Sequence, residues 1–267
     1  MKTHGTKTIS FTSGKGGVGK TTLLSNISVC MAQKGAQVLV LDGDWGMANV
    51  DIHFNVKAKG TIYEVIQGTK KAADILVSLS PGVDLLPGGR GVYDLAHLSS
   101  FERRTAFEAI LSLPQKYDFV FVDTSPGLHE NVLFLNTHVD EIVMVLTAEA
   151  SSLADSYALI KVLNQKNKVK KFSILCNQVN DELDGLKLYE RFDQVVNRFL
   201  NIGLDYLGSI PMDNGFRKSQ NLQRLILKQD FSTFSSLQKV AQEILSTKKQ
   251  SQIKGIEDFW EGLVGAA

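Results

Sequence analysis

Short apolar runs alternate with longer amphipathic segments along this chain. The runs VLVL, FVFV and IVMVL are apolar at nearly every position, which is typical of strands buried on both faces of a sheet. Strands are predicted at residues 8–12, 37–42, 83–86, 119–123, 141–147, 172–177 and 206–210. Helical spacing falls at residues 20–33, 101–111, 154–164, 186–199 and 234–245. This alternation predicts an α/β fold, with a mostly parallel β-sheet flanked by helices on both faces.

Composition narrows the class of protein. The chain has 267 residues, of which 43% are hydrophobic and 21% charged, so it can bury a core unaided. Its net charge of +1 gives no strong positive electrostatic field of the kind that a dedicated nucleic-acid-binding protein has. We therefore expect no specific nucleic-acid partner. The two cysteines, Cys30 and Cys176, lack metal-ligand spacing. No signal peptide or bilayer-spanning run is apparent, and we expect a cytoplasmic protein.

A phosphate-binding loop is predicted between the first strand and the first helix. Residues 13–22 (SGKGGVGKTT) contain the pattern G-x-x-x-x-G-K-[ST] in the strand–loop–helix context that it requires. Glycines let several backbone N–H groups point at one anion, and the helix N-terminus adds positive potential. Lys20 would reach the β- and γ-phosphates, and the hydroxyl of Thr21 would bind Mg²⁺. The candidate nucleotide ligands are Gly14, Lys15, Gly16, Gly17, Val18, Gly19, Lys20, Thr21 and Thr22.

The lysine at position 15 is an addition to the ordinary loop, and alone it is equally a solvated charge. The string KGGVGKTT resembles the deviant phosphate loop of the MinD/ParA family of P-loop ATPases. In that family this lysine reaches across a dimer interface to the nucleotide of the partner. The resemblance therefore implies a homodimer in the ATP state and slow ATP hydrolysis, in which Lys15 acts in trans as an arginine finger does.

Aspartates follow two of the predicted strands, at the edge of the sheet where ligands bind in parallel α/β folds. Asp123 ends FVFVD and matches the Walker B position, which holds Mg²⁺. Asp42 and Asp44 match the D-x-D of the family. By resemblance, Asp42 supports the magnesium shell with Thr21 and Asp123, while Asp44 orients the attacking water and joins Lys15 and Lys20 as a catalytic group. The alternative is that Asp42 and Asp44 only form a turn after a strand.

Two residues further along the chain match family contacts to the nucleoside. Asn177 ends the strand SILCN, where relatives use an asparagine to contact adenine, and Asp213 follows the last predicted strand. The alternatives are that Asn177 merely ends a strand and that Asp213 caps a helix. No guanine-specific N/T-K-x-D motif occurs. The sequence thus favours ATP, with Mg²⁺, over GTP.

The C-terminal residues form a separate unit in this interpretation. Residues 1–247 are predicted to be the ATPase domain, and residues 248–267 a polar linker followed by an amphipathic helix. On a helical wheel, six apolar side chains fall within an arc of about 140°. MinD-like proteins keep a membrane-targeting helix at this place, although the stripe could instead dock on a partner or on the protein itself. The residues of the stripe are Ile253, Ile256, Phe259, Trp260, Leu263 and Val264.

The stretch GMANVDIHF, followed by IYEVIQG, is most similar to the FlhG (FleN) branch of the family, which regulates flagellar number and placement. The resemblance implies flagellar assembly or regulatory partners and reversible association with the cytoplasmic membrane. Because only residues 1–7 precede the first predicted strand, stimulation of an FlhF-like GTPase through an N-terminal extension is not expected. The alternatives are a MinD-type regulator of the division site and a nucleotide-binding scaffold or transcription-factor antagonist with negligible turnover.

Overall fold

The computed structural model describes residues 5–45, 47–92, 94–95, 98–99, 101–102, 105–106, 113, 117–213 and 232–247. The predicted C-terminal linker and helix, residues 248–267, lie outside the described residues, as does Gly46 after the D-x-D motif. The predicted helix at 101–111 is described only at residues 101–102 and 105–106, which are helical.

The described strands form one sheet of eight, in the order β3-β4-β2-β5-β1-β6-β7-β8. All neighbouring pairs are parallel except β3 and β4, which are antiparallel at one edge. The strands are β1 (Lys7–Thr12), β2 (Val38–Gly43), β3 (Val77–Ser80), β4 (Val83–Leu86), β5 (Phe119–Thr124), β6 (Glu141–Leu146), β7 (Ser173–Val179) and β8 (Asp205–Pro211). The predicted mostly parallel sheet is confirmed.

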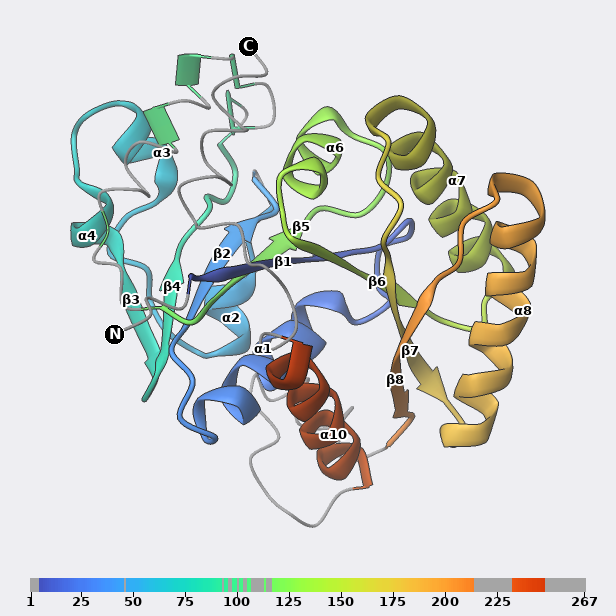
Figure 1. The fold of residues 1–267 in the computed structure, drawn as a ribbon. Coiled ribbons are helices and arrows are strands. Elements are labelled where there is room, and N and C mark those ends of the chain that lie inside the picture. Colours follow the sequence, from blue (N-terminus) through green and yellow to red (C-terminus); the bar gives the residue numbers. More distant parts are fainter. Residues whose placement is uncertain are drawn as a thin grey trace.

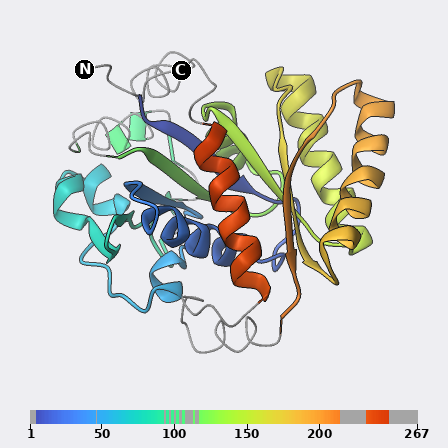
Figure 2. The same ribbon diagram turned by 60° about the horizontal axis from the view of Figure 1, so that its bottom comes forward.

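Helices cover both faces of the sheet (Figure 1). They are α1 (Lys20–Ala32), α2 (Val50–His53), α3 (Ile62–Ile66), α4 (Ala72–Ile75), α6 (Glu130–Thr137), α7 (Ala150–Asn167), α8 (Glu182–Leu200) and α10 (Ser232–Thr247). Figure 2 shows α1 and α10 side by side on one face, with α7 and α8 beyond the sheet on the other. None of the described helices is long and apolar enough to cross a membrane.

The core explains why the central strands are apolar throughout. On β5, Phe119 and Phe121 pack with the residues of α1 and α10, whereas Val120 and Val122 join the cluster on the opposite face. On β6, Val143 likewise packs in the same cluster as Phe119 and Phe121. Its neighbours Ile142 and Met144 point to the other face and join a third cluster, under α7 and α8. Successive side chains of a strand point to opposite faces, so a strand covered on both sides has no polar face.

The connections place a crevice at the carboxyl ends of the central strands. Helix α1 leads from β1 to β2, which lies on one side of β1 in the sheet. Helix α6 leads from β5 to β6, which lies on the other side of β1. The direction of winding therefore reverses at β1, where parallel α/β sheets bind their ligands. The loop from β1 to α1 lies at this point.

Candidate functional site

The loop between β1 and α1 wraps one wall of a pocket of about 410 Å³. Gly17 and Gly19 have φ angles of 80° and 89°, which favour glycine, and Gly19 is the N-cap of α1. A Cβ on Gly14 would lie 2.2 Å from the carbonyl carbon of Asp155 in α7, and one on Gly19 would lie 2.5 Å from Nδ2 of Asn177. The glycines are therefore required both by backbone angle and by close packing, and the loop surrounds a space at the start of a helix.

The two polar side chains that open α1 are both bound to Asp123. The Nζ of Lys20 donates to Oδ1 of Asp123 at 2.8 Å, and the hydroxyl of Thr21 donates to Oδ2 at 2.6 Å. All three side chains are buried. The predicted Walker A lysine, Walker A threonine and Walker B aspartate thus converge, although they come from segments about a hundred residues apart. Asp123 thus binds the ammonium of Lys20 and the hydroxyl of Thr21, the two groups that are predicted to contact phosphate and metal.

Asp42 lies beside Asp123, because the two residues are paired in the register of β2 and β5. Its carboxylate accepts backbone N–H bonds from Asn49 and Val50 at 3.0 Å and from Asp44 at 3.2 Å. Burial, together with the negative charges of Asp123 and Asp44, raises the pKa of Asp42 to about 7. Asp42 therefore shapes the D-x-D turn and the start of α2, and a bound divalent cation would favour its ionised form.

This arrangement fits a magnesium nucleotide. The hydroxyl of Thr21 and the carboxylates of Asp42 and Asp123 are hard oxygen donors of the kind Mg²⁺ selects, and phosphate oxygens complete such a site. The glycine loop offers N–H groups at the N-terminus of α1 for the phosphates. The individual ligand roles of these residues stay predictions.

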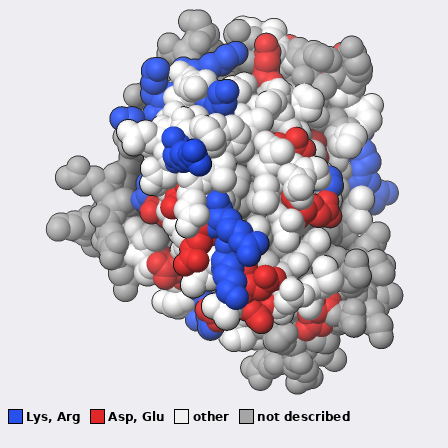
Figure 3. Space-filling model, turned by 90° about the vertical axis from the view of Figure 1, so that its right-hand side faces the viewer, with Lys and Arg blue, Asp and Glu red and all other residues white. Residues whose placement is uncertain are grey.

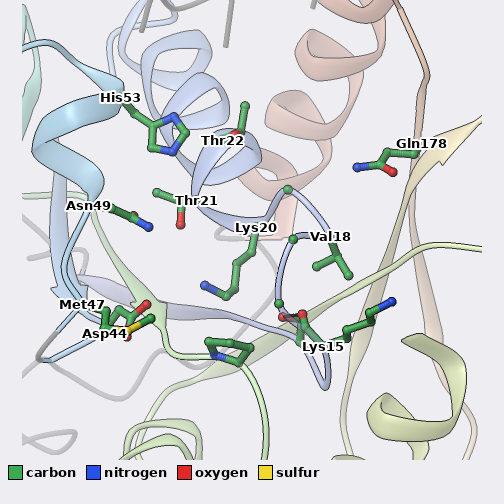
Figure 4. A pocket seen from close by; sticks show the side chains of 15 residues that line it. Lys15, Val18, Lys20, Thr21, Thr22, Asp44, Met47, Asn49, His53 and Gln178 are labelled. Carbon is green, nitrogen blue, oxygen red and sulfur yellow. Dashed lines mark hydrogen bonds between the residues drawn. The ribbon is translucent and has the colours of Figure 1, made fainter. Parts of the chain in front are cut away.

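Asp44 and Lys15 lie on different sides of the pocket. Asp44 lines the wall near the ammonium of Lys20, whereas Lys15 extends away from Lys20 (Figure 4). The Nζ of Lys15 is paired with the carboxylate of Glu149 and donates to the hydroxyl of Ser151 at 3.0 Å, and all three side chains are exposed or part-exposed. Lys15 therefore lines the pocket, but its ammonium is held at the start of α7 and points away from Lys20.

The two residues predicted to contact the nucleoside differ in position. Asn177 is buried, and its Nδ2 donates to the carbonyl of Val18 at 2.7 Å, so it supports the phosphate loop directly. The next residue, Gln178, has a φ of 58° and lines the pocket instead. Asp213 follows β8, is half-buried and does not line the pocket. Base contacts by Asn177 and Asp213 stay predictions.

Several site residues were not identified from the sequence. Met47, Asn49, His53, Pro126 and Gln178 line the pocket with the predicted residues. The sequence did give a signal for them, because each follows one of three features: the D-x-D motif, the Walker B strand or the strand SILCN.

Arg90 was also missed, although it holds the segment after the D-x-D motif. Its Nε and Nη2 donate to the carbonyl of Ala48 at 2.9 and 2.7 Å, and Nη2 contacts Asp51 at 3.0 Å. No local pattern gives this contact, since Arg90 and Ala48 are 42 residues apart.

The side of the molecule where α8 lies carries mixed charge. Figure 3 shows Lys and Arg next to Asp and Glu over much of this face, with blue side chains gathered toward its top. Lys187 and Arg191 are exposed on α8, and so is Glu190 between them. Among the described residues of this face, Lys and Arg do not form the continuous basic track that phosphate backbones favour. The expectation of no specific nucleic-acid partner stays a prediction.

Comparisons with known proteins agree with this geometry. A family model described as an AAA domain matches residues 6–175. The chain is 33% identical over 264 residues to the antiactivator FleN of Pseudomonas aeruginosa, which covers 98% of this chain and 94% of FleN. It is 35% identical over 256 residues to the flagellum site-determining protein YlxH of Helicobacter pylori, covering 94% and 81% of the two chains.

A solved structure is similar over almost the whole chain. It is the septum site-determining protein MinD from Pyrococcus horikoshii, complexed with Mg-ADP, at 26% identity and a TM-score of 0.71. The match covers 92% of this chain and 100% of that structure.

Proposed function

The chain belongs to the MinD/ParA family of P-loop ATPases, and from that membership we propose that it is a FleN-like switch that regulates flagellar number or placement. In this proposal it dimerises on binding ATP, hydrolyses ATP slowly, and moves between the cytosol and the cytoplasmic membrane. The observation that carries the proposal is the position of Lys15, whose part-exposed ammonium extends away from Lys20 and is paired with Glu149. A part-exposed ammonium that points away from the loop lysine of its own chain is suited to contact the nucleotide of a second copy.

Binding begins with an exchange of partners at Asp123. Lys20 leaves Asp123 for the β- and γ-phosphates, which replaces one buried charge pair with another. Thr21 and Asp123 are then free to hold Mg²⁺ with Asp42. When bound, Mg²⁺ neutralises phosphate charge and fixes the phosphate chain in place. The glycine loop supplies backbone N–H donors at the N-terminus of α1.

Hydrolysis needs an oriented water and added positive charge. Asp44 lies on the pocket wall near the ammonium of Lys20, so its carboxylate is placed to orient a water against the terminal phosphate. Lys15 is released from Glu149 and Ser151 when two chains associate, and it then contacts the nucleotide of the partner. Because the Lys15–Glu149 pair is exposed, breaking it costs little.

The flagellar role rests on relatives. FleN and YlxH, whose names concern flagella, are 33% and 35% identical to this chain, whereas the MinD of Helicobacter pylori is 23% identical. We therefore place the chain with the flagellar regulators ahead of the division regulators. Residues 253–264 serve as the membrane-binding helix in this proposal.

Substitution of Lys15 tests the switch. Lys15→Ala is expected to bind ATP within a few-fold of the native affinity but to stay monomeric and release little phosphate. Lys187→Ala removes an exposed lysine on α8 and is the matched control, expected to behave as the native protein. Size-exclusion chromatography with light scattering, in ATP and in ADP, measures the oligomeric state. A phosphate-release assay measures hydrolysis. A loss of ATP affinity in Lys15→Ala well beyond a few-fold, with Lys187→Ala unchanged, or native dimerisation of Lys15→Ala, would contradict the proposal.

A further inference from the structure

His53 faces the nucleotide pocket from a position that the proposed mechanism does not use. It is the last residue of α2, and it lines the same pocket as the phosphate loop. Figure 4 shows its ring pointing from α2 toward Thr21 and Thr22 at the first turn of α1. The ring therefore stands across the pocket from the N–H groups that open α1.

The backbone just before His53 is held by two side chains from other parts of the chain, Asp42 and Arg90. The carboxylate of Asp42 accepts the N–H groups of Asn49 and Val50, which begin α2. Arg90 donates to the carbonyl of Ala48 and pairs with Asp51. A side chain on a segment held in this way is preorganised, so a contact from it loses little conformational entropy.

The imidazole itself has no hydrogen bond to any residue in the described part of the chain. It is partly buried, and burial lowers its pKa from the ordinary value, with Lys20 acting in the same direction and Asp123 and Asp51 opposing. The neutral ring carries one N–H donor and one acceptor nitrogen. A half-buried donor directed into a phosphate pocket without a protein partner is matched by a phosphate oxygen.

We propose that His53 is a nucleotide-binding residue that donates a ring N–H to the α- or β-phosphate, the part of the phosphate chain that ATP and ADP share. This inference rests on the proposed function as an ATP-binding protein and adds a contact to its site.

The position of Lys20 indicates which phosphates His53 would contact. The lysine of a phosphate loop reaches the β- and γ-phosphates. Figure 4 places the Lys20 ammonium toward Asp44 and Met47, and His53 at the opposite end of the wall that α2 and its preceding turn form. The γ-phosphate therefore lies toward Asp44, and His53 is left with the inner phosphates.

A metal-ligand role for His53 fits less well. Mg²⁺ prefers oxygen ligands. In the part of the chain that the structure describes, no group of three or more His, Cys, Asp or Glu side chains is placed to hold a metal ion. A phosphate contact uses the donor that the neutral ring has, and it needs no further ligand.

Three substitutions separate a hydrogen bond from simple space filling. His53→Ala removes both the donor and the volume, His53→Phe keeps volume without a donor, and His53→Gln keeps an N–H donor. In calorimetric titrations of the full chain with Mg-ADP and with Mg-ATP, the first two variants should lose about tenfold in affinity for both nucleotides, the size of one hydrogen bond to a charged group. His53→Gln should stay within threefold of the native affinity. Thermal unfolding without nucleotide verifies that each variant is folded.

The outcomes are distinct. Native affinity in His53→Phe, a loss in His53→Gln as large as in His53→Ala, or a loss for ATP alone would each overturn the assignment while leaving the ATPase proposal intact. Failure of the native chain to bind either nucleotide would overturn the proposed function and this inference together. If the native chain binds nucleotide and the His53 variants behave as expected, but Lys15→Ala still dimerises, only the trans role of Lys15 fails.

Discussion

At the residue scale, Asp123 connects the fold to the chemistry. It is fully buried at the end of β5, and its two oxygens bind Lys20 and Thr21. A buried carboxylate without partners would be costly, so the same contacts that prepare the site also stabilise the free protein. Nucleotide binding must then exchange these contacts for equivalent ones, which keeps charges paired in both states.

This double role gives a prediction about stability and binding together. Lys20→Met leaves Asp123 buried without its cation and should lower the free energy of unfolding by about 3–5 kcal/mol. Asp123→Asn added to Lys20→Met removes the stranded charge and should recover most of that loss, without restoring ATP binding. Urea unfolding and nucleotide titration measure the two effects. A double variant as unstable as Lys20→Met would mean that the charge pair is not what stabilises this edge.

Asp44 gives a second prediction at the same scale. Its carboxylate lines the pocket wall, while its backbone N–H and carbonyl belong to the turn held by Asp42 and Met47. Asp44→Asn keeps the shape but removes the base, so ATP binding and dimerisation should persist while phosphate release falls about 10²–10⁴-fold. Single-turnover phosphate release and sizing in ATP measure this. Release at the native rate would assign the water-orienting role to another group.

At the scale of elements, what could be predicted depended on how local the determinant was. The strands VLVL and FVFV were predicted because burial on both faces leaves a direct mark in the sequence. The four-residue helices α2 and α4 and the edge strand β3 were not predicted, because each is too short to display a period.

The candidate site also contains residues that local motifs predict and contacts that no local motif predicts. The phosphate loop and Asp123 follow from motifs, whereas the partners of Lys15 do not, since Glu149 lies 134 positions away. Asp42 was expected at the metal, and the structure adds that it accepts three backbone N–H groups, a role that depends on a turn no motif describes.

One buried network joins several elements at the edge of the sheet opposite the nucleotide. The Nζ of Lys7 on β1 donates to Glu141 on β6 and to Thr247 at the end of α10, each at 2.6 Å, and Ser173 on β7 donates to the other oxygen of Glu141. Burial raises the pKa of Glu141, but Lys7 and Ser173 outweigh it, and the net pKa lies below the ordinary 4.5. The network ties the last described helix to the central strands.

This network predicts a pH dependence of stability. Because the folded pKa of Glu141 is depressed, the unfolded chain binds the proton more readily, and stability rises with pH across that window. The contribution should be complete above the ordinary pKa of 4.5 and should be lost as pH falls through the folded value. Urea unfolding from pH 3 to 7 should give a smaller acid-side slope for Glu141→Gln than for the native chain. Equal slopes in the two proteins would refute the assignment.

At the scale of the whole molecule, the site and the end of α10 are separate in position. The nucleotide pocket lies at the carboxyl ends of the strands, whereas α10 ends at Thr247, which is bound to Lys7 at the start of β1. The described part of α10 therefore ends at the edge of the sheet opposite the pocket. The apolar stripe predicted in residues 248–267 consists of aliphatic and aromatic side chains, which are not ligands of phosphate or metal. Under the proposed function, ATP controls this segment through the association of two chains.

That separation gives the last prediction. Removing residues 248–267 should leave ATP affinity and dimerisation intact but abolish sedimentation with anionic liposomes. The native chain should sediment in ATP and far less in ADP, because one twelve-residue helix with three acidic neighbours binds lipid weakly, while two helices on one dimer gain about 10²–10⁴ through effective concentration.

Phe259→Glu should behave as the truncation does, since it places a charge inside the stripe, whereas Glu257→Gln changes a charge outside the stripe and should retain binding. If the native chain ignores liposomes in both nucleotides, and truncation instead lowers the melting temperature by several degrees, then the stripe packs on the protein itself and the membrane role is wrong.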